Sequence, residues 1–327
     1  MQQIIDRETA VGEYISIYLD SLRINTVLNF DLFLGKGGEY ILYRSAKLPF
    51  TEKNRATLLD NDIDRLYIKA ANTHQYQKYI EANIKEIIDD DSINETTKAG
   101  IVYDSARFAV KEILSNPALG ENIKRSQKMV ESTVAYILRG QQAFYNLLKV
   151  MSFDYYTYTH SINVCTFSLA LARHIGIDNI TDLNILGTGA LLHDVGKTKI
   201  SEEILNKIDP LTDAEMQLIR KHPRWGFEII KKTDIIHPES YHPIIEHHER
   251  ENGTGYPNKL DAEKIHFHSK IVAIADVFDA MTTERVYRHA IAAYPALKTM
   301  FDDTGAFNRE LLEQFTRLMG PSELTNL

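Results

Sequence analysis

The sequence has little of several features that would otherwise define a class of protein. Its 327 residues include one cysteine, Cys165, so no disulfide can form within the chain, and a reducing cytoplasm is the expected setting. No apolar run approaches the roughly 20 residues that a membrane-spanning helix needs. The first residues also lack the basic start and apolar stretch of a signal peptide. We therefore expect a soluble cytoplasmic protein without a membrane span.

Positive charge is also in short supply. The chain has 37 Lys and Arg against 45 Asp and Glu, a formal net charge of −8. This balance argues against binding to a DNA or RNA polymer, which requires a basic face. A small anion can still bind where cations gather locally. The composition, 44% hydrophobic and 25% charged, is that of a globular protein, and the length suffices for two domains.

Residues 1–91 predict a small mixed α/β domain. Residues 26–34 alternate as a strand, and residues 39–44 return as the second strand of a hairpin. A short helix capped by Thr51, a strand near 64–69 and a polar helix ending at the acidic run 89–91 follow. Residues 11–22 fit either a helix or a short strand with a turn. No motif here carries chemistry, and we interpret the domain as a sensory or adaptor unit.

Residues 92–139 predict a helical linker. One helix spans about 95–114 and ends before Pro117. A second begins near Glu121 and keeps apolar residues at helical spacing as far as Met151. Such a stripe favours core packing, and a homodimer through the linker helices is the alternative.

Residues 140–327 predict an all-α domain. Helix signals alternate there with Gly and Pro stops, and strand signals are nearly absent. The whole chain is therefore expected to be α+β, with a helical domain after a small mixed one.

Histidine and aspartate recur on the apolar segments of this helical half. A single residue such as His160 on an apolar helix face would more often be a core histidine than a ligand, but the pattern repeats at His193, Asp194, His222, His247, His248 and Asp276. A buried carboxylate such as Asp276 needs a cation to remain charged. Imidazole favours Fe, Mn or Zn over Mg or Ca. Two such ions about 3.5–4 Å apart would activate a water and hold the oxygens of a phosphoryl group.

Cations that could bind phosphate lie close to these residues. Lys197 follows His193 and Asp194 by one turn, and Lys270, Arg285 and Arg288 flank Asp276. Arginine suits bidentate phosphate contacts.

Two motifs carry a resemblance to a known family. They are HDVGK at 193–197 and HHERENGTGYP at 247–257, supported by blocks at 156–161, 222–226 and 276–288. Together they resemble an HD-GYP domain, a branch of the HD phosphohydrolase superfamily, over about residues 140–310. The resemblance implies a bacterial phosphodiesterase that hydrolyses cyclic di-GMP to linear pGpG and often on to GMP.

The resemblance also implies roles, carried over by position. The metal ligands would be His160, His193, Asp194, His222, His247, His248 and Asp276. Asp194 would bridge the ions and act in catalysis with Lys197, which would polarise the scissile phosphate or the leaving group. The substrate would be held by Lys197, Arg285, Arg288, Gly255 and Tyr256. The loop at 253–257 can also meet partner proteins such as diguanylate cyclase domains.

The implied cofactor is a pair of divalent transition-metal ions, Fe or Mn ahead of Zn, Ni or Co. Some family members carry a Glu four residues before the first histidine and bind three ions. Here that position is Tyr156, a poor replacement for a carboxylate, and nearby Asp154 would need a different backbone path. We therefore predict two ions.

Two alternatives remain open from the sequence. One is an HD phosphohydrolase of another nucleotide, and the other is a catalytically weak module that binds cyclic di-GMP and signals. The other histidines of this half are interpreted as surface, helix-end or loop residues: His174, His237, His242, His266, His268 and His289.

Overall fold

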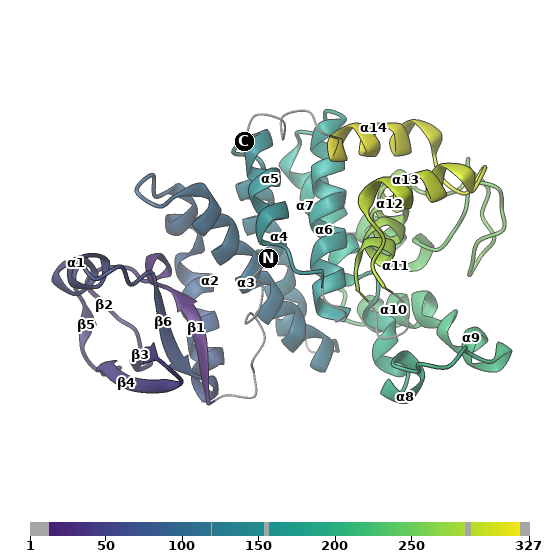
Figure 1. The fold of residues 1–327 in the computed structure, drawn as a ribbon. Helices are drawn as coiled ribbons and strands as arrows, with labels where there is room; N and C mark the ends of the chain where they lie inside the picture. Colours follow the sequence, from purple (N-terminus) through teal and green to yellow (C-terminus); the bar gives the residue numbers. More distant parts are fainter. Residues whose placement is uncertain (1–12, 119, 154–156, 285–288, 321–327) are drawn as a thin grey trace. The chain divides into compact units, whose positions relative to one another are not determined.

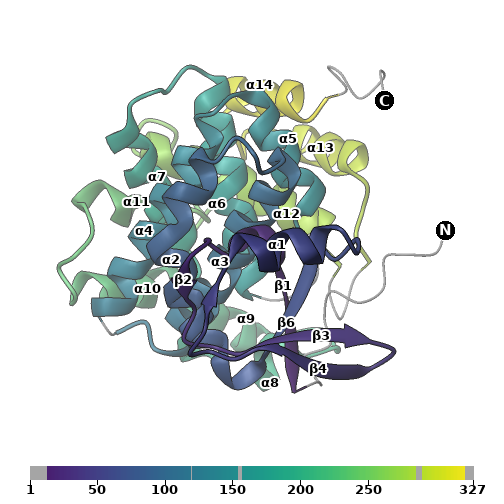
Figure 2. The same cartoon turned by 90° about the vertical axis from the view of Figure 1, so that its left-hand side faces the viewer.

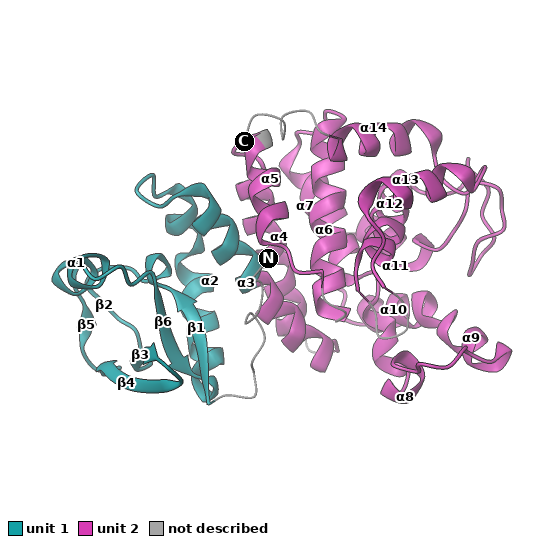
Figure 3. Cartoon of the chain, in the orientation of Figure 1, with its two compact units in different colours: residues 1–105 teal, residues 106–327 magenta. Residues whose placement is uncertain are grey.

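The computed structural model describes residues 13–118, 120–153, 157–284 and 289–320. The chain divides into two compact units, residues 1–105 and residues 106–327 (Figure 3). The first contains a small sheet and the second is helical. The α+β class is thus confirmed at this level, with a small sheet before a helical domain.

The first unit is built on a four-stranded antiparallel sheet of order β1-β6-β3-β4. These strands are β1 (Tyr14–Tyr18), β6 (Arg65–Lys69), β3 (Leu32–Lys36) and β4 (Glu39–Arg44), and β2 (Thr26–Val27) pairs with β5 (Pro49–Phe50). The β3–β4 hairpin predicted from the sequence is present, and Figure 2 shows it extending along one edge of the sheet. Its turn uses Gly37 and Gly38, both at positive φ.

Helices complete this unit. They are α1 (Glu52–Leu59), α2 (Thr73–Asp89) and the first part of α3 (Glu95–Ser115), with short 3-10 helices η1 (Leu19–Ser21) and η2 (Ala70–Asn72). Thr51 caps α1 through a reciprocal capping box with Asn54, as its sequence position predicted. The buried side chains of α2 recur at helical intervals, including Ile80, Ile84 and Ile87.

For the first unit, the structure decides one prediction that was left open and contradicts another. Residues 14–21 form a strand followed by a 3-10 turn, which decides between the two alternatives left open for 11–22. The single strand predicted over 26–34 is wrong, because the chain forms β2 and β3 with a turn between them. Asn29 lies there at a φ of 62°, a left-handed conformation that interrupts an extended strand.

The second unit is a stack of helices that begins with the last part of α3 and continues with α4 to α14. Those that follow α3 are α4 (Gly120–Ile137), α5 (Gln141–Val150), α6 (Thr157–His174), α7 (Ile180–Leu192), η3 (Val195–Lys199), α8 (Glu202–Leu205), α9 (Asp213–Ile219), α10 (His222–Lys231), η4 (Pro238–Ser240), α11 (Tyr241–Glu246), α12 (Phe267–Thr282), α13 (Ala293–Asp302) and α14 (Arg309–Met319). The one helix predicted from Glu121 to Met151 is wrong, since Gly140 breaks it at a φ of 138°.

The core of this unit is centred on α6, which packs against both α7 and α12 (Figure 1). Phe167 of α6 lies edge-on to Phe278 of α12 at 5.4 Å and to Phe315 of α14 at 5.9 Å. The apolar stripe of α4 is buried against α7, where a Cβ on Gly187 would lie 2.6 Å from a methyl of Val130. The stripe therefore serves core packing. Among the described helices, none is both long and apolar enough to cross a bilayer.

Candidate metal centre

The structure gathers all seven predicted metal ligands in one cluster. They come from five segments: His160 from α6, His193 and Asp194 from the end of α7, His222 from the start of α10, His247 and His248 from the end of α11, and Asp276 from α12. The side chain of His248 is 20% exposed and those of the other six are less than 10% exposed. Such a concentration of buried imidazole and carboxylate requires compensation inside the protein.

Backbone carbonyls fix three of the histidine rings. Nδ1 of His193 lies 2.7 Å from the carbonyl oxygen of Ala190, and Nδ1 of His222 lies 2.7 Å from that of Ile219. His247 makes the same contact with Pro243 at 2.9 Å. Each carbonyl can only accept, so each Nδ1 donates, and each Nε2 is left as a lone pair that faces the cluster.

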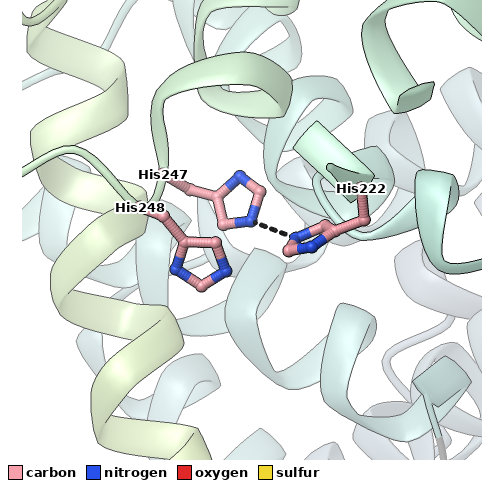
Figure 4. A group of neighbouring side chains, drawn as sticks. All are labelled: His222, His247 and His248. Atoms are coloured by element: carbon pink, nitrogen blue, oxygen red, sulfur yellow. Dashed lines mark hydrogen bonds between the residues drawn. The ribbon is translucent and has the colours of Figure 1, made fainter. Parts of the chain in front are cut away.

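Two of these lone pairs face one another. Nε2 of His222 lies 3.1 Å from Nε2 of His247, with His248 beside them (Figure 4). Two nitrogens bound to one tetrahedral ion at about 2.0–2.1 Å lie roughly 3.3 Å apart. The observed separation therefore suits a shared cation. Such a cation would bind both lone pairs, which otherwise repel one another.

The ligands form two groups with a carboxylate between them. One group is His222, His247 and His248, and the other is His160, His193 and Asp194, with the ligand atoms of each group within 4.8 Å of one another. Oδ1 of Asp194 lies 3.2 Å from Nε2 of His222, while its Oδ2 lies 3.4 Å from Nε2 of His193. One carboxylate thus presents an oxygen to each group, which is the arrangement of a bridging ligand.

Asp276 repeats this arrangement. Its Oδ1 lies 3.1 Å from Nε2 of His160, and its Oδ2 lies 3.7 Å from Nδ1 of His248. Nε2 of His193 and Oδ1 of Asp194 are buried without a hydrogen-bond partner. Such orphaned atoms are costly unless a cation binds them. The donor set therefore fits a divalent metal centre with two adjacent positions.

The sequence did not reveal the support behind His160. Nδ1 of His160 lies 2.7 Å from Oδ2 of Asp279, a fully buried carboxylate whose Oδ1 accepts a hydrogen bond from Asn163 at 2.8 Å. Asp279 follows Asp276 by three residues on α12, so both carboxylates reach α6 from one helix face. That spacing was a visible signal, but Asp279 was predicted neither as a ligand nor as a support.

The electrostatics follow from burial and proximity. Burial alone would lower the pKa of His160, but hydrogen bonds to Asp276 and Asp279 outweigh it and raise that pKa to about 9. Burial, reinforced by neighbouring histidines, holds the pKa values of His247 and His248 well below their ordinary value. Burial would raise the pKa of Asp194, but the charges of Lys197 and His193 prevail and lower it.

Lys197 lies at the edge of the cluster. Its Nζ is 2.5 Å from Oδ2 of Asp194, and its side chain is 23% exposed. The neighbouring residue, Gly196, lies against the backbone of α10. A Cβ there would be 1.9 Å from the carbonyl oxygen of His222 and 2.6 Å from the backbone nitrogen of Gly226. A glycine at this position lets η3 pack directly on α10.

The loop at 253–257 closes against the same cluster. The ring of Tyr256 stacks on that of His248 at 4.7 Å. Gly255 lies so close to the backbone that a Cβ would be 2.4 Å from the Cα of Glu249. The buried carboxylate of Glu249 in turn accepts backbone hydrogen bonds from Asn258 at 2.6 Å and Leu260 at 2.9 Å. This holds the loop beside the histidines.

One cation near the cluster was not expected from the sequence. The Arg220 guanidinium lies 5.4 Å from the centre of the Tyr256 ring, a neighbour that the sequence did not indicate. Lys270 instead pairs with Glu251 at 3.0 Å. Arg285, Arg288, Tyr156 and Asp154 lie outside the described residues, so their predicted roles remain predictions.

A cluster of histidines and aspartates in a helical domain is the combination expected of a metal-dependent hydrolase. Residues 142–311, just over half the chain, match the family model of the HD domain. The chain belongs to the HD domain family, which confirms the resemblance seen in the sequence.

The relatives of this chain include named phosphodiesterases. The chain is 32% identical to the cyclic di-GMP phosphodiesterase PA4108 of Pseudomonas aeruginosa over 228 residues, 69% of this chain and 55% of that protein. It is 34% identical to the 3'3'-cGAMP-specific phosphodiesterase 3 of Vibrio cholerae over 145 residues, 44% of this chain and 31% of that protein. The chain thus spans about half of the length of the Pseudomonas relative and about a third of the length of the Vibrio relative.

A solved structure shares the fold of almost the whole chain. Bd1817 of Bdellovibrio bacteriovorus, an HDG"Y"P protein, superposes with a TM-score of 0.65 and covers 94% of this chain and 99% of its own, at 24% identity. The likeness extends beyond the HD domain to the sheet-containing unit.

Proposed function

We propose that this chain hydrolyses cyclic di-GMP, to pGpG or GMP, in cytoplasmic second-messenger signalling. The observation that carries the proposal is the pair Asp194 and Asp276, each of which offers one oxygen to each of two histidine groups. That geometry suits two adjacent ions, the arrangement used for in-line displacement at phosphorus. The family and the printed names of its relatives support cyclic dinucleotides as the substrate class.

Each set of residues has a distinct part in this proposal. His222, His247 and His248 would hold one ion and His160 and His193 the other, with Asp194 and Asp276, whose oxygens face both groups, completing the ligand set. Two bound divalent ions supply Lewis acidity, which lowers the pKa of a water molecule and neutralises charge on phosphoryl oxygens. We propose Fe or Mn ahead of Zn, Ni or Co, and two ions rather than three because Tyr156 stands where a third would need a carboxylate.

The chain's own cations act on the substrate. Lys197 places an ammonium beside Asp194 at the solvent-facing edge, where it can stabilise the charge that develops on the scissile phosphate. Tyr256 offers an aromatic face next to His248, suited to stacking a base or ribose. Arg285 and Arg288 are proposed to hold a substrate phosphate. Gly255 is proposed to serve the substrate site by letting the loop that carries Tyr256 pack beside the histidines.

The direct experiment is anaerobic purification, elemental analysis, and turnover of cyclic di-GMP on the same sample. We expect about two ions per chain and cleavage to pGpG or GMP. His193→Ala and Asp194→Ala should abolish turnover, whereas His174→Ala, at the exposed end of α6, should not. Full turnover in either of the first two variants would refute the site.

A second candidate substrate is 3'3'-cGAMP, which the name of the Vibrio cholerae relative supports. Turnover assays on a panel of nucleotides, with Mn or Fe present, distinguish the two candidate substrates. Turnover of another nucleotide without turnover of cyclic di-GMP would reject the first proposal. A metal-loaded chain that binds cyclic di-GMP without cleaving it would favour a signalling module. We also propose diguanylate cyclase domains as partners at the 253–257 loop.

A further inference from the structure

A second group of metal-binding side chains lies away from the catalytic cluster. Glu239, His266 and His268 each offer one ligand atom, and these atoms lie within 4.8 Å of one another. His268 and Asp276 both belong to α12, eight residues apart, which corresponds to roughly 12 Å along the helix axis. No ion could be shared over that distance. The two groups are therefore separate.

Buried hydrogen bonds hold both sides of this group. Glu239 lies in η4, and the next residue, Ser240, donates a hydrogen bond from its hydroxyl to the carbonyl oxygen of Ile185 in α7 at 2.8 Å. His266 is the N-cap of α12, and the carboxylate of Glu246 accepts hydrogen bonds from its backbone nitrogen at 3.0 Å and from the Ser269 hydroxyl at 2.8 Å. The ligands therefore stand on anchored elements, as a preorganised site requires.

The imidazoles are also oriented. The ring of His266 stacks on that of His242 at 4.3 Å with an interplanar angle of 8°, and Nδ1 of His242 lies 2.7 Å from the Glu246 carboxylate. His268 is 8% exposed, and its Nδ1 is buried without a hydrogen-bond partner. Burial and the neighbouring His266 lower the pKa of His268 to about 4, so it is neutral at pH 7 and keeps a lone pair. An orphaned nitrogen of this kind needs an explanation, and a ligand supplies one.

We propose that Glu239, His266 and His268 form a peripheral site for a divalent transition-metal ion, with Zn²⁺ as the best match. Two imidazoles and one carboxylate are the donor set that zinc takes with water in the remaining position. Glu239 is exposed, so water can reach the ion. The site would join η4, which precedes the helix leading to His247, to α12, which carries Asp276.

Two features oppose this ion, and both are outweighed. Nδ1 of His266 accepts a hydrogen bond from the backbone nitrogen of His268 at 3.2 Å, and that bond is lost if Nε2 is the ligand and the proton moves to Nδ1. A capping bond contributes far less than a metal–ligand bond. The start of α12 also disfavours a cation. The negative charges of Glu239 and Asp182, which raise the pKa of His268, offset this effect.

The test compares zinc binding by the full chain and by two variants chosen to preserve the fold. Glu239→Gln keeps the size of an exposed side chain. His266→Asn removes the imidazole but retains a good N-cap acceptor for the His268 nitrogen. His174→Ala, an exposed histidine on α6, is the matched control. After chelator treatment and a check of folding by circular dichroism, each protein is titrated with Zn²⁺ against a chromogenic chelator and then desalted for elemental analysis.

We expect the wild-type chain and His174→Ala to bind one Zn²⁺ more than either variant. In the two variants, the affinity of this site for Zn²⁺ should fall by more than the roughly 10-fold to 100-fold that follows loss of a residue that only supports a ligand. Both variants should keep their Mn²⁺-dependent turnover. Equal zinc stoichiometry and affinity in the wild type and the folded variants would overturn the proposal. So would a loss of zinc that always accompanies loss of turnover, because the residues would then belong to the catalytic centre. The comparison is made between wild type and variants because a third catalytic ion would raise the total count in all of them equally.

Discussion

The carboxylate of Asp279 accepts a hydrogen bond from Nδ1 of His160 at 2.7 Å and thereby determines which nitrogen of that histidine faces Asp276. Its other oxygen accepts from Asn163 at 2.8 Å, so the carboxylate is used on both sides. Two acceptor oxygens are needed here. This explains why an aspartate rather than an amide occupies a fully buried position.

Asp279→Asn should therefore damage the centre without removing a ligand. If the amide nitrogen faces His160, Nδ1 must accept and Nε2 becomes protonated, so it cannot bind a metal. If the amide nitrogen faces Asn163, two donors meet in a buried site. We expect metal affinity and turnover to fall by roughly 10-fold to 100-fold.

The measurement is metal content after dialysis, together with turnover and the thermal unfolding midpoint. Asp302→Asn, an exposed aspartate on α13, is the control. If Asp279→Asn retains wild-type metal content and turnover, the carboxylate has no role in setting the tautomer of His160.

Lys197→Met tests whether the lysine acts on the substrate or only balances Asp194. Its ammonium is not a metal ligand, so the variant should still bind metal. Turnover should fall by roughly 10²–10³-fold, the usual cost of losing one group that stabilises developing charge. Lys199→Met, an exposed lysine on the same 3-10 helix, should be active. Loss of metal in parallel with turnover would show instead that Lys197 mainly supports the charge of Asp194.

Much of the centre was predictable because five of its seven ligands lie where helices begin or end. His193, His222 and His247 lie close to Gly or Pro residues near the ends of helices. At these positions a nearby backbone carbonyl accepts a hydrogen bond from each Nδ1. The repetition of that pattern was visible in the sequence. The partnership between Asp279 and His160 depends on how α12 packs on α6, which periodicity alone does not specify. Arg220 is a similar case, since its neighbour Tyr256 is distant in the chain.

The fold was predicted less well where a single backbone conformation decides it. Apolar spacing continues across Gly140, yet its positive φ ends one helix and a second begins at Gln141. Asn29 divides a predicted strand in the same way. Propensity and periodicity average over several residues, so they do not detect a single residue with positive φ.

The first unit should lose stability in acid through Asp90. Hydrogen bonds from Ser92 and Arg23 lower the pKa of Asp90 to about 2, from 3.8. Because the folded-state pKa is depressed, this contribution is complete above the unfolded value and is lost as the pH falls from about 4 to about 2. After discounting for a side chain that is 29% exposed, we expect about 1 kcal/mol at neutral pH.

The measurement is urea unfolding of the wild type and Asp90→Asn from about pH 7 to about pH 3. The stability difference between them should shrink over the acid end of that range. Asp60→Asn, an exposed aspartate of the same unit, is the matched control. A difference that stays constant down to about pH 3 would show that Asp90 contributes through something other than its charge.

Arg220→Ala should weaken substrate binding with little effect on chemistry. The guanidinium is exposed and lies over Tyr256, which itself stacks on His248, so it extends the aromatic surface beside the cluster with positive charge. A group that contacts substrate and transition state equally changes KM rather than kcat. We expect KM for cyclic di-GMP to rise by about three- to tenfold. Arg220→Lys should recover part of this, and Lys221→Ala, the exposed neighbour, should resemble the wild type. If kcat falls instead while KM is unchanged, Arg220 acts on the transition state, and the aromatic surface around Tyr256 belongs to the reacting end of the substrate.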